Sequence, residues 1–228
     1  MKDKSHVIDK VFWSAYNRYW EKLEQPASSV EQVEKIINLL LENGAKPGQR
    51  VIDAGCGNGL YSLALAKNGF RATGVDFAPG VLASAQRKAE QQHLNADFEK
   101  MDLDNHFWFA DGYFDHAFCL SVLNLLNRPK WALNELHRIL KPGGLLIVSL
   151  WLDPVKYRES YPEMFQPSTA NSNGVKDRAK QAARNLSGRS IHTRFWSVEE
   201  FQDLLTKQGF EILQMGGSPM LLAVARRA

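Results

Sequence analysis

The sequence predicts an α/β fold: a doubly wound, mostly parallel sheet of seven strands, with helices at the N-terminus and a cap insertion after the fifth strand. From about residue 50 onward, short apolar segments alternate with helical patterns, and parallel strands need such long crossovers. A glycine-rich turn follows the first apolar segment directly. The 228 residues are 44% hydrophobic and 23% charged, which is typical of a globular protein. We therefore expect a single domain over residues 1–228.

The expected strands are short, rich in apolar and β-branched residues, and separated by turn residues. They lie at residues 50–54, 71–76, 96–101, 115–120, 145–150, 210–215 and 220–225. The sequence Gly216-Gly217-Ser218-Pro219 between the last two predicts an antiparallel pair. Helices are expected at residues 61–67, 81–92 and 130–140. A further helix should begin after the capping box Ser197-x-x-Glu200 and end at Lys207.

Two amphipathic helices are expected before the first strand, and we interpret residues 1–47 as an N-terminal helical lid. The first covers residues 7–23 and carries an aromatic stripe at helical spacing, which either packs on the domain or closes over a bound substrate. The second begins near Ser28, where Ser28-x-x-Glu31 is a capping box. Its apolar face comprises Val30, Val33, Ile36, Ile37, Leu40 and Leu41.

Residues 153–195 interrupt the alternation of strands and helices, and we expect a substrate-cap insertion there. Three prolines and the polar run Asn171-Ser172-Asn173-Gly174 mark this stretch. Lys176, Lys180 and Arg184 recur every four residues and give one basic face. Such a face is usually solvated, but it could also contact RNA, a phosphorylated small molecule or an anionic membrane surface.

Several classes of protein are disfavoured by composition. No apolar run approaches the roughly 18 residues of a membrane-spanning helix. The N-terminus is polar and lacks the apolar core of a secretory signal, so a cytoplasmic location is expected. Cys56 and Cys119 form no Cys-x-x-Cys pair and are expected to be free thiols. The net charge of +3 says little about function.

The loop after the first strand carries the strongest signal of a cofactor site. It reads Asp53-Ala54-Gly55-Cys56-Gly57-Asn58-Gly59, and its glycines let the backbone turn sharply and a ligand approach closely. The spacing is G-x-G-x-G, whereas the dinucleotide fingerprint G-x-G-x-x-G would need a glycine at Leu60. A tight turn without a ligand is the alternative, which three glycines after an acid make the poorer explanation.

A second acid stands at the end of the second strand. Asp76 follows Gly55 by 21 residues, and a carboxylate there can accept both ribose hydroxyls of an adenosine cofactor. The alternative is that Asp76 caps the helix that begins near Pro79. Its combination with the glycine loop favours the ribose role.

Together, these motifs resemble those of class I S-adenosylmethionine-dependent methyltransferases, particularly the ubiquinone and menaquinone C-methyltransferase branch. The resemblance covers residues 51–150, with a weaker similarity at 196–213. It implies a Rossmann-like methyltransferase fold and S-adenosylmethionine as the cofactor. In this family the acid and glycine loop holds the methionine part of the cofactor, and the second acid holds the ribose. The resemblance thus assigns the methionine part to Asp53, Gly55, Cys56 and Gly57. It assigns the ribose to Asp76 and places Phe77 beside the adenine.

The resemblance also implies contacts beyond the third and fourth strands. The family places an acid against the adenine amino group, and we assign this role to Asp102, with Met101 and Leu103 flanking the adenine ring. Asp104 is the alternative acid for this role. Packing in the hydrophobic core would explain Met101 and Leu103 equally well. Leu120 and the following Ser121-Val122-Leu123-Asn124 should line the floor beneath the sulfonium. No Asn/Asp-Pro-Pro-Tyr/Phe follows, which argues against methylation of exocyclic base amines. Pro142-Gly143-Gly144 should form a structural turn before the fifth strand.

Methyl transfer from a sulfonium is an in-line displacement, so the protein mainly aligns the reactants and excludes water. The expected reaction is transfer to an oxygen, nitrogen or carbon atom of a small molecule. His192 is a candidate general base, and Tyr16 and Tyr19 are candidate substrate-binding residues. No metal site is expected, because no His, Cys or carboxylate cluster has ligand spacing.

Three other functions compete with methylation of a small molecule. An RNA methyltransferase would use the basic face of the insertion, although nucleic acid is the less favoured partner. A module that binds the cofactor without turnover would share the same loop. A nicotinamide-dependent oxidoreductase is disfavoured by the glycine spacing.

Overall fold

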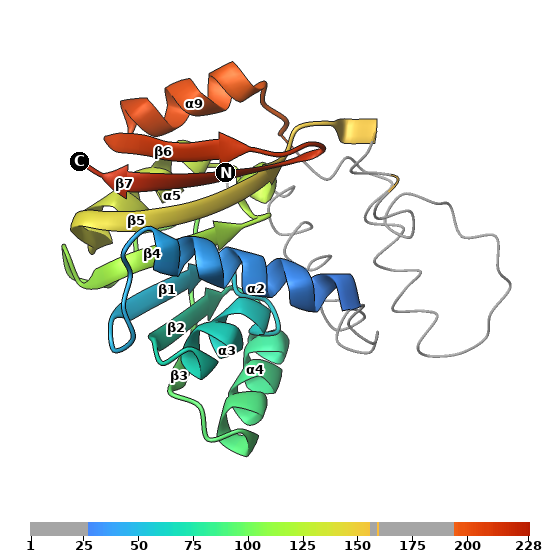
Figure 1. Cartoon of the computed structure of the whole chain (residues 1–228), viewed down its shortest axis with the longest axis vertical. Coiled ribbons are helices and arrows are strands. Elements are labelled where there is room, and N and C mark those ends of the chain that lie inside the picture. Colours follow the sequence, from blue (N-terminus) through green and yellow to red (C-terminus); the bar gives the residue numbers. More distant parts are fainter. Residues whose placement is uncertain (1–26, 156–158, 160–193) are drawn as a thin grey trace, which may run out of the picture.

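The fold is an open, twisted seven-stranded sheet with helices on both faces, seen in a computed structural model that describes residues 27–155, 159 and 194–228 (Figure 1). The strand order is β3-β2-β1-β4-β5-β7-β6. Strands β1 to β5 pair in parallel, whereas β7 is antiparallel to both β5 and β6. The predicted α/β fold, with a mostly parallel seven-stranded sheet, is confirmed.

The strands lie close to where the sequence places them. Their bounds are β1 Arg50–Ala54, β2 Arg71–Asp76, β3 Ala96–Lys100, β4 Phe114–Leu120, β5 Leu140–Trp151, β6 Phe210–Gly216 and β7 Met220–Arg227. The first two agree with the predicted ranges residue for residue. The fifth begins earlier than predicted because Leu140 already pairs with Phe114.

The helices also follow the predicted order. Their bounds are α2 Ala27–Glu42, α3 Leu60–Lys67, α4 Pro79–Gln91, the 3-10 helix η1 Leu123–Leu125, α5 Pro129–Ile139 and α9 Val198–Lys207. Helix α9 begins with the predicted capping box: the Ser197 hydroxyl accepts from the Glu200 amide, and the Glu200 carboxylate accepts from the Ser197 amide. The reciprocal bonds satisfy two amides that a helix start leaves unpaired.

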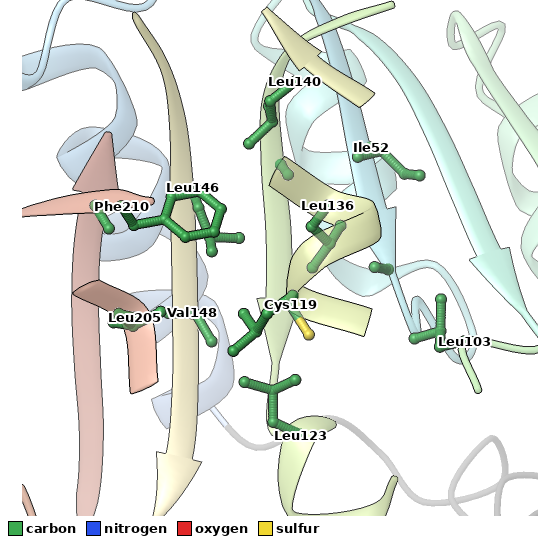
Figure 2. Packing of buried hydrophobic residues seen from close by; sticks show 14 of the residues in the cluster. Ile52, Leu103, Cys119, Leu123, Leu136, Leu140, Leu146, Val148, Leu205 and Phe210 are labelled. Carbon is green, nitrogen blue, oxygen red and sulfur yellow. The ribbon is translucent and has the colours of Figure 1, made fainter. Parts of the chain in front are cut away.

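Alternate side chains of β1, β2, β4 and β5 enter two hydrophobic clusters, one on each face of the sheet, whereas β3 contributes to one of them only. On one face, Leu146 and Val148 of β5 pack with Leu136 of α5 and Leu205 of α9 (Figure 2). On the other face, neighbouring strand residues such as Ile147 pack with α2 and α3. A strand that is buried on both faces reads as a continuous apolar run, which is why the sequence of β5 is so uniformly hydrophobic.

Helix α2 belongs to the core layer of the second face. Val33, Ile36, Ile37 and Leu40 are buried there, as its helical spacing predicts, but Val30 is 55% exposed and lies outside the apolar contact. Residues 1–26, which include the first predicted helix, lie outside the described part of the chain. The role of residues 1–47 as a lid therefore stays a prediction.

The segment Pro142-Gly143-Gly144 differs from the predicted turn between a helix and a strand. Strand β5 has already begun at Leu140, and the pairing with β4 skips from Leu140 to Leu145. Gly143 has a φ of +77° within this irregularity. The three residues thus form a bulge inside the strand, and the helix ends directly into the strand instead of through a turn.

Candidate functional site

The candidate site lies at the carboxyl edge of the sheet where the strand order reverses. Strand β1 has β2 and β3 on one side, and β4 and β5 on the other. Connections from neighbouring strands depart in opposite directions at such a point, which leaves a crevice where ligands of open α/β sheets bind. The loop of residues 53–59 after β1 and the segment of residues 121–125 after β4 meet here. Val122 lies against Gly55, so a Cβ at Gly55 would collide with its side chain.

Asp53 is a buried carboxylate near the end of β1. It is 2% exposed, and the Ser62 hydroxyl of α3 donates to its Oδ2 atom across 2.6 Å. Burial raises the pKa of Asp53 to about 6, although the hydrogen bonds from Ser62 act in the opposite direction. A carboxylate that is held with so little solvation is suited to pair with a ligand cation.

Asp76 joins the end of β2 to the glycine loop and to α4. Its Oδ2 accepts from the Gly57 amide at 3.1 Å, and its Oδ1 accepts from the Ala78 amide at 2.9 Å. Burial raises the pKa of Asp76 against the lowering effect of these two amides. Ala78 is the N-cap residue of α4, and no side chain of the described residues caps the first turn of that helix, so Asp76 orders the chain that enters α4 without serving as its N-cap. A carboxylate can accept about four hydrogen bonds, so the two amide contacts leave capacity for a ligand.

The three glycines of the loop are needed for different reasons. Added Cβ atoms at Gly55 and Gly59 would meet neighbours: Val122 at the first, and Ala85 at 2.8 Å with Phe98 at 3.0 Å at the second. Gly57 has a φ of +53°, and within the described part of the chain no heavy atom other than those of its chain neighbours lies within 4 Å of its added Cβ. Gly57 is therefore the glycine that leaves open space, while the other two permit close packing of the protein on itself.

Asp102 and Asp104 have distinct environments. Asp104 is buried, and its carboxylate accepts from the Arg128 amide at 2.8 Å and the Asn127 side chain at 3.1 Å, so it fastens the start of α5. Asp102 is partly exposed and accepts from the Asp104 amide and the Asn105 side chain. Of the two acids, Asp102 is thus the one with a carboxylate at the surface.

The remaining predicted cofactor residues lie along the same edge. Met101 and Leu103 are buried in the first hydrophobic cluster, so packing accounts for both side chains. Phe77 directly follows Asp76, and Leu120 is the last residue of β4. Both side chains are half-buried. Cys56 is buried within the glycine loop, and this burial raises the pKa of its thiol. Cys56 and Cys119 are both free thiols, as predicted.

Sequence reasoning missed Asn124 as an organising residue. It is 1% exposed, and its side chain accepts from the Trp151 amide and donates to the carbonyls of Trp151 and Arg194. Its own carbonyl accepts from the Arg194 amide at 2.8 Å. These contacts join residues that are 27 and 70 positions apart in the chain, which no local sequence pattern reveals.

Three predicted site residues lie outside the described part of the chain: Tyr16, Tyr19 and His192. So do the basic residues Lys176, Lys180 and Arg184 and most of the predicted cap, residues 153–195. Across residues 27–155, 159 and 194–228, no three His, Cys, Asp or Glu side chains gather as metal ligands would. No helix within these ranges is long and apolar enough to cross a membrane.

Comparison with known proteins identifies similar sequences and folds. The family model described as a methyltransferase domain matches residues 52–148. The ubiquinone biosynthesis O-methyltransferase of Pseudomonas aeruginosa strain UCBPP-PA14 is 27% identical over 150 residues, which are 65% of this chain and 64% of that protein. The match therefore spans less than two thirds of the relative.

Solved structures share the fold at low sequence identity. Magnesium protoporphyrin IX methyltransferase from Synechocystis PCC 6803, solved with bound SAH, has a TM-score of 0.65 and 19% identity, covering 94% of this chain and 93% of its own. The [4+2]-cyclase SpnF has a TM-score of 0.63 and 20% identity, covering 85% of this chain and 80% of its own. Because one fold carries both of these named activities, the fold alone does not assign a reaction.

Proposed function

Residues 52–148 form a methyltransferase domain of the class I S-adenosylmethionine-dependent family, and from this premise we propose that the chain methylates a small molecule. The observation that carries the proposal is the arrangement around Gly57: its amide is bonded to the buried carboxylate of Asp76, and among the described residues no atom beyond its chain neighbours lies within 4 Å of a Cβ built on it. The opening lies where the strand order reverses, which is the ligand site of open α/β sheets.

The side chains along this edge fit the three parts of S-adenosylmethionine. Asp53 is suited to the ammonium group of the methionine part, because a buried carboxylate gains most from a neighbouring cation. Asp76 has acceptor capacity for ribose hydroxyls beyond its two amide contacts. Asp102 carries the partly exposed carboxylate assigned to the adenine amino group, with Phe77 beside the ring. Gly55 and Cys56 supply the loop backbone, and Leu120 the floor.

The bound cofactor supplies an electrophilic methyl group on a sulfonium. The chain's contribution is to hold the acceptor in line with that group and to exclude water. We assign Tyr16 and Tyr19 to the substrate pocket, with residues 1–47 as a lid and 153–195 as a cap. His192 is assigned as the general base for an acceptor that must lose a proton. The name of the Pseudomonas aeruginosa relative favours an oxygen nucleophile among oxygen, nitrogen and carbon.

A cytoplasmic location accompanies this proposal, since free thiols persist in a reducing compartment. Both thiols are buried, and buried thiols are poor nucleophiles because burial disfavours the thiolate form.

Calorimetric titration with S-adenosylhomocysteine and, separately, with NAD tests the cofactor assignment. We expect the wild type to bind S-adenosylhomocysteine alone, and Asp76→Asn to bind it at least about tenfold more weakly, a loss of about 1.4 kcal/mol. Asp97→Asn, an exposed acid on the neighbouring strand β3, is the matched control and should bind like the wild type. Binding of NAD alone, or unchanged affinity in Asp76→Asn, would contradict the assignment.

Turnover separates an enzyme from a module that only binds the cofactor. The wild type is incubated with S-adenosylmethionine and a panel of phenols, carboxylic acids and amines, and release of S-adenosylhomocysteine is measured. We expect release above the acceptor-free rate with at least one phenol. Equal rates with every acceptor would contradict methyl transfer to these classes.

A further inference from the structure

Ser121 has an unusual backbone conformation for a residue with a side chain. Its φ is +58°, in the left-handed region, and among the described residues only His93 is another non-glycine with a positive φ. The left-handed region brings Cβ close to the following carbonyl, so L-residues avoid it unless the surroundings hold them there. Ser121 directly follows β4 and directly precedes Val122, the residue that contacts the glycine loop.

Ser149 of β5 makes the contacts that hold Ser121 in place. The Ser121 amide donates both to the Ser149 carbonyl at 3.1 Å and to the Ser149 hydroxyl at 3.0 Å. The two hydroxyl oxygens lie 3.5 Å apart, and the Ser121 hydroxyl also donates to the sulfur of Met220 on β7. Ser149 is 1% exposed in the middle of an apolar strand, where a hydroxyl is costly unless it is hydrogen-bonded.

The conformation of Ser121 decides where Val122 lies. Val122 lies so close to Gly55 that any side chain there would collide with it. On its other side, Gly55 is fixed by its own amide, which donates to the Val75 carbonyl at 2.8 Å, as does the Cys56 amide at 3.0 Å. The glycine loop is therefore confined between β2 and the segment that Ser121 directs.

We propose that Ser149 is a positioning residue for the glycine loop and acts through the left-handed conformation of Ser121. Its hydroxyl supplies the second acceptor for the Ser121 amide, which keeps Val122 against Gly55 and so keeps the loop in its binding geometry. The effect on cofactor affinity rests on the proposed function, whereas the effect on the loop backbone does not.

The test uses one variant that removes the Ser149 hydroxyl and a second substitution, at Ser121, that makes the left-handed backbone conformation favourable without that hydroxyl. Ser149→Ala leaves Ser121 with a single acceptor, so we expect Ser121 to relax and Val122 to move away from Gly55. Adding Ser121→Gly should restore the geometry, because glycine adopts a positive φ without steric cost. Ser84→Ala is the matched control, since it removes another buried serine hydroxyl from helix α4.

Two readouts are measured for each protein: hydrogen exchange of the Gly55 and Cys56 amides, and calorimetric titration with S-adenosylhomocysteine. In Ser149→Ala we expect both amides to exchange at least about tenfold faster and the dissociation constant to rise about tenfold, which corresponds to about 1.4 kcal/mol. The double variant should return the exchange rates of both amides to within about twofold of wild type, and Ser84→Ala should leave the exchange rates and the dissociation constant unchanged.

Three outcomes would overturn the proposal: unchanged exchange in Ser149→Ala, faster exchange throughout the sheet instead of in the loop, or failure of Ser121→Gly to rescue. The second and third are what a merely structural serine predicts. If the wild type does not bind S-adenosylhomocysteine, the proposed function fails, and hydrogen exchange still decides whether Ser149 positions the loop.

Discussion

The hydroxyl of Ser62 lies 2.6 Å from the Oδ2 atom of Asp53, in a place where neither side chain reaches solvent. This bond joins the first turns of α3 to the end of β1 beneath the glycine loop. Within the described part of the chain, the Ser62 hydroxyl is the side-chain donor that offsets the burial of the Asp53 charge. Asp53 is thus strongly desolvated, and no cationic side chain of the described residues acts on it, so its protonation should be visible in the dependence of stability and binding on pH.

Stability should depend on pH through Asp53. Burial raises the pKa of Asp53 from 3.8 to about 6, so the folded state binds its proton more tightly than the unfolded state. The free energy of unfolding should therefore fall as pH rises from 4.5 through 6, by about 2 kcal/mol at 1.36 kcal/mol per pKa unit. Urea unfolding of the wild type and Asp53→Asn at pH 4.5 and 7.5 measures this. An equal pH dependence of the free energy of unfolding in the two proteins would show that Asp53 is not the group responsible.

Affinity for S-adenosylhomocysteine should weaken as pH falls through about 6, because protonation of Asp53 removes the charge that pairs with the ligand ammonium. Ser62→Ala removes a hydrogen bond that lowers the pKa of Asp53, so the pH midpoint of binding should move upward in this variant. Titrations between pH 5 and 8 give both midpoints. A Ser62→Ala midpoint at or below that of the wild type would show that Asp53 does not set the profile.

The loop glycines should separate stability from binding. Gly59→Ala places a Cβ 2.8 Å from Ala85 in a left-handed conformation, so unfolding should become easier by about 2 kcal/mol or more. Gly57→Ala meets no neighbour, so it should cost only about 1 kcal/mol for its positive φ. Because its methyl group enters the open space, it should nevertheless weaken S-adenosylhomocysteine binding at least about tenfold. Chemical unfolding measures the loss of stability in each variant, and calorimetry measures its affinity for S-adenosylhomocysteine. Equal binding by the wild type and Gly57→Ala would exclude a ligand at the open space beside Gly57.

The ion pair of Arg138 with Glu135 should matter more than that of Lys141 with Asp115. Burial raises the pKa of Glu135, but hydrogen bonds from Arg138 and the Phe107 amide outweigh it and lower that pKa below its usual value. The Glu135 side chain is only 4% exposed, so Arg138→Met should cost about 3 kcal/mol at pH 7. Lys141→Met affects a pair whose lysine is 47% exposed and should cost less than about 1 kcal/mol. Urea unfolding of both variants at pH 7 measures the two losses of stability. Similar losses in Arg138→Met and Lys141→Met would refute the claim that the first ion pair matters more.

The same ion pair sets a second pH dependence, opposite in sign to that of Asp53. Because the folded-state pKa of Glu135 is lowered, its stabilisation is fully present above pH 4.5 and is lost as pH falls below that value. Arg138→Met should reduce this loss. Acid unfolding curves of the two proteins provide the comparison.

The fold was largely predictable because each parallel strand is a short apolar run between turn residues. The ranges of β1 and β2 follow directly from those boundaries. The start of β5 did not, because Leu140 already pairs with Phe114, and the ladder then resumes at Leu145 with His116 after the bulge that contains Pro142-Gly143-Gly144. Sequence read locally treats such residues as a turn, whereas the neighbouring strand determines that they interrupt a ladder.

The positions of Asp53 and Asp76 at the carboxyl ends of β1 and β2 were predictable, because both strands are short and Asp53 stands just before the glycines of the loop. The choice between Asp102 and Asp104 required the structure, since only the contacts with Asn127 and Arg128 show that Asp104 fastens α5. Ser149 gave no signal, because its partner Ser121 lies 28 residues away, directly after the neighbouring strand β4. Long-range hydrogen bonds of this kind are set by strand register, which composition and periodicity do not encode.

Asn124 joins the two described residues between which the insertion begins and ends. Its amide side chain is bonded to Trp151, where β5 ends, and to Arg194, where the described chain resumes. With both ends joined at one residue, the entropic cost of closing the intervening segment grows only slowly with its length. The length of the chain between Trp151 and Arg194 can therefore change at a small entropic cost while this junction stays in place. If that segment forms the substrate cap proposed above, acceptor choice can change with it while the proposed cofactor-binding residues are kept.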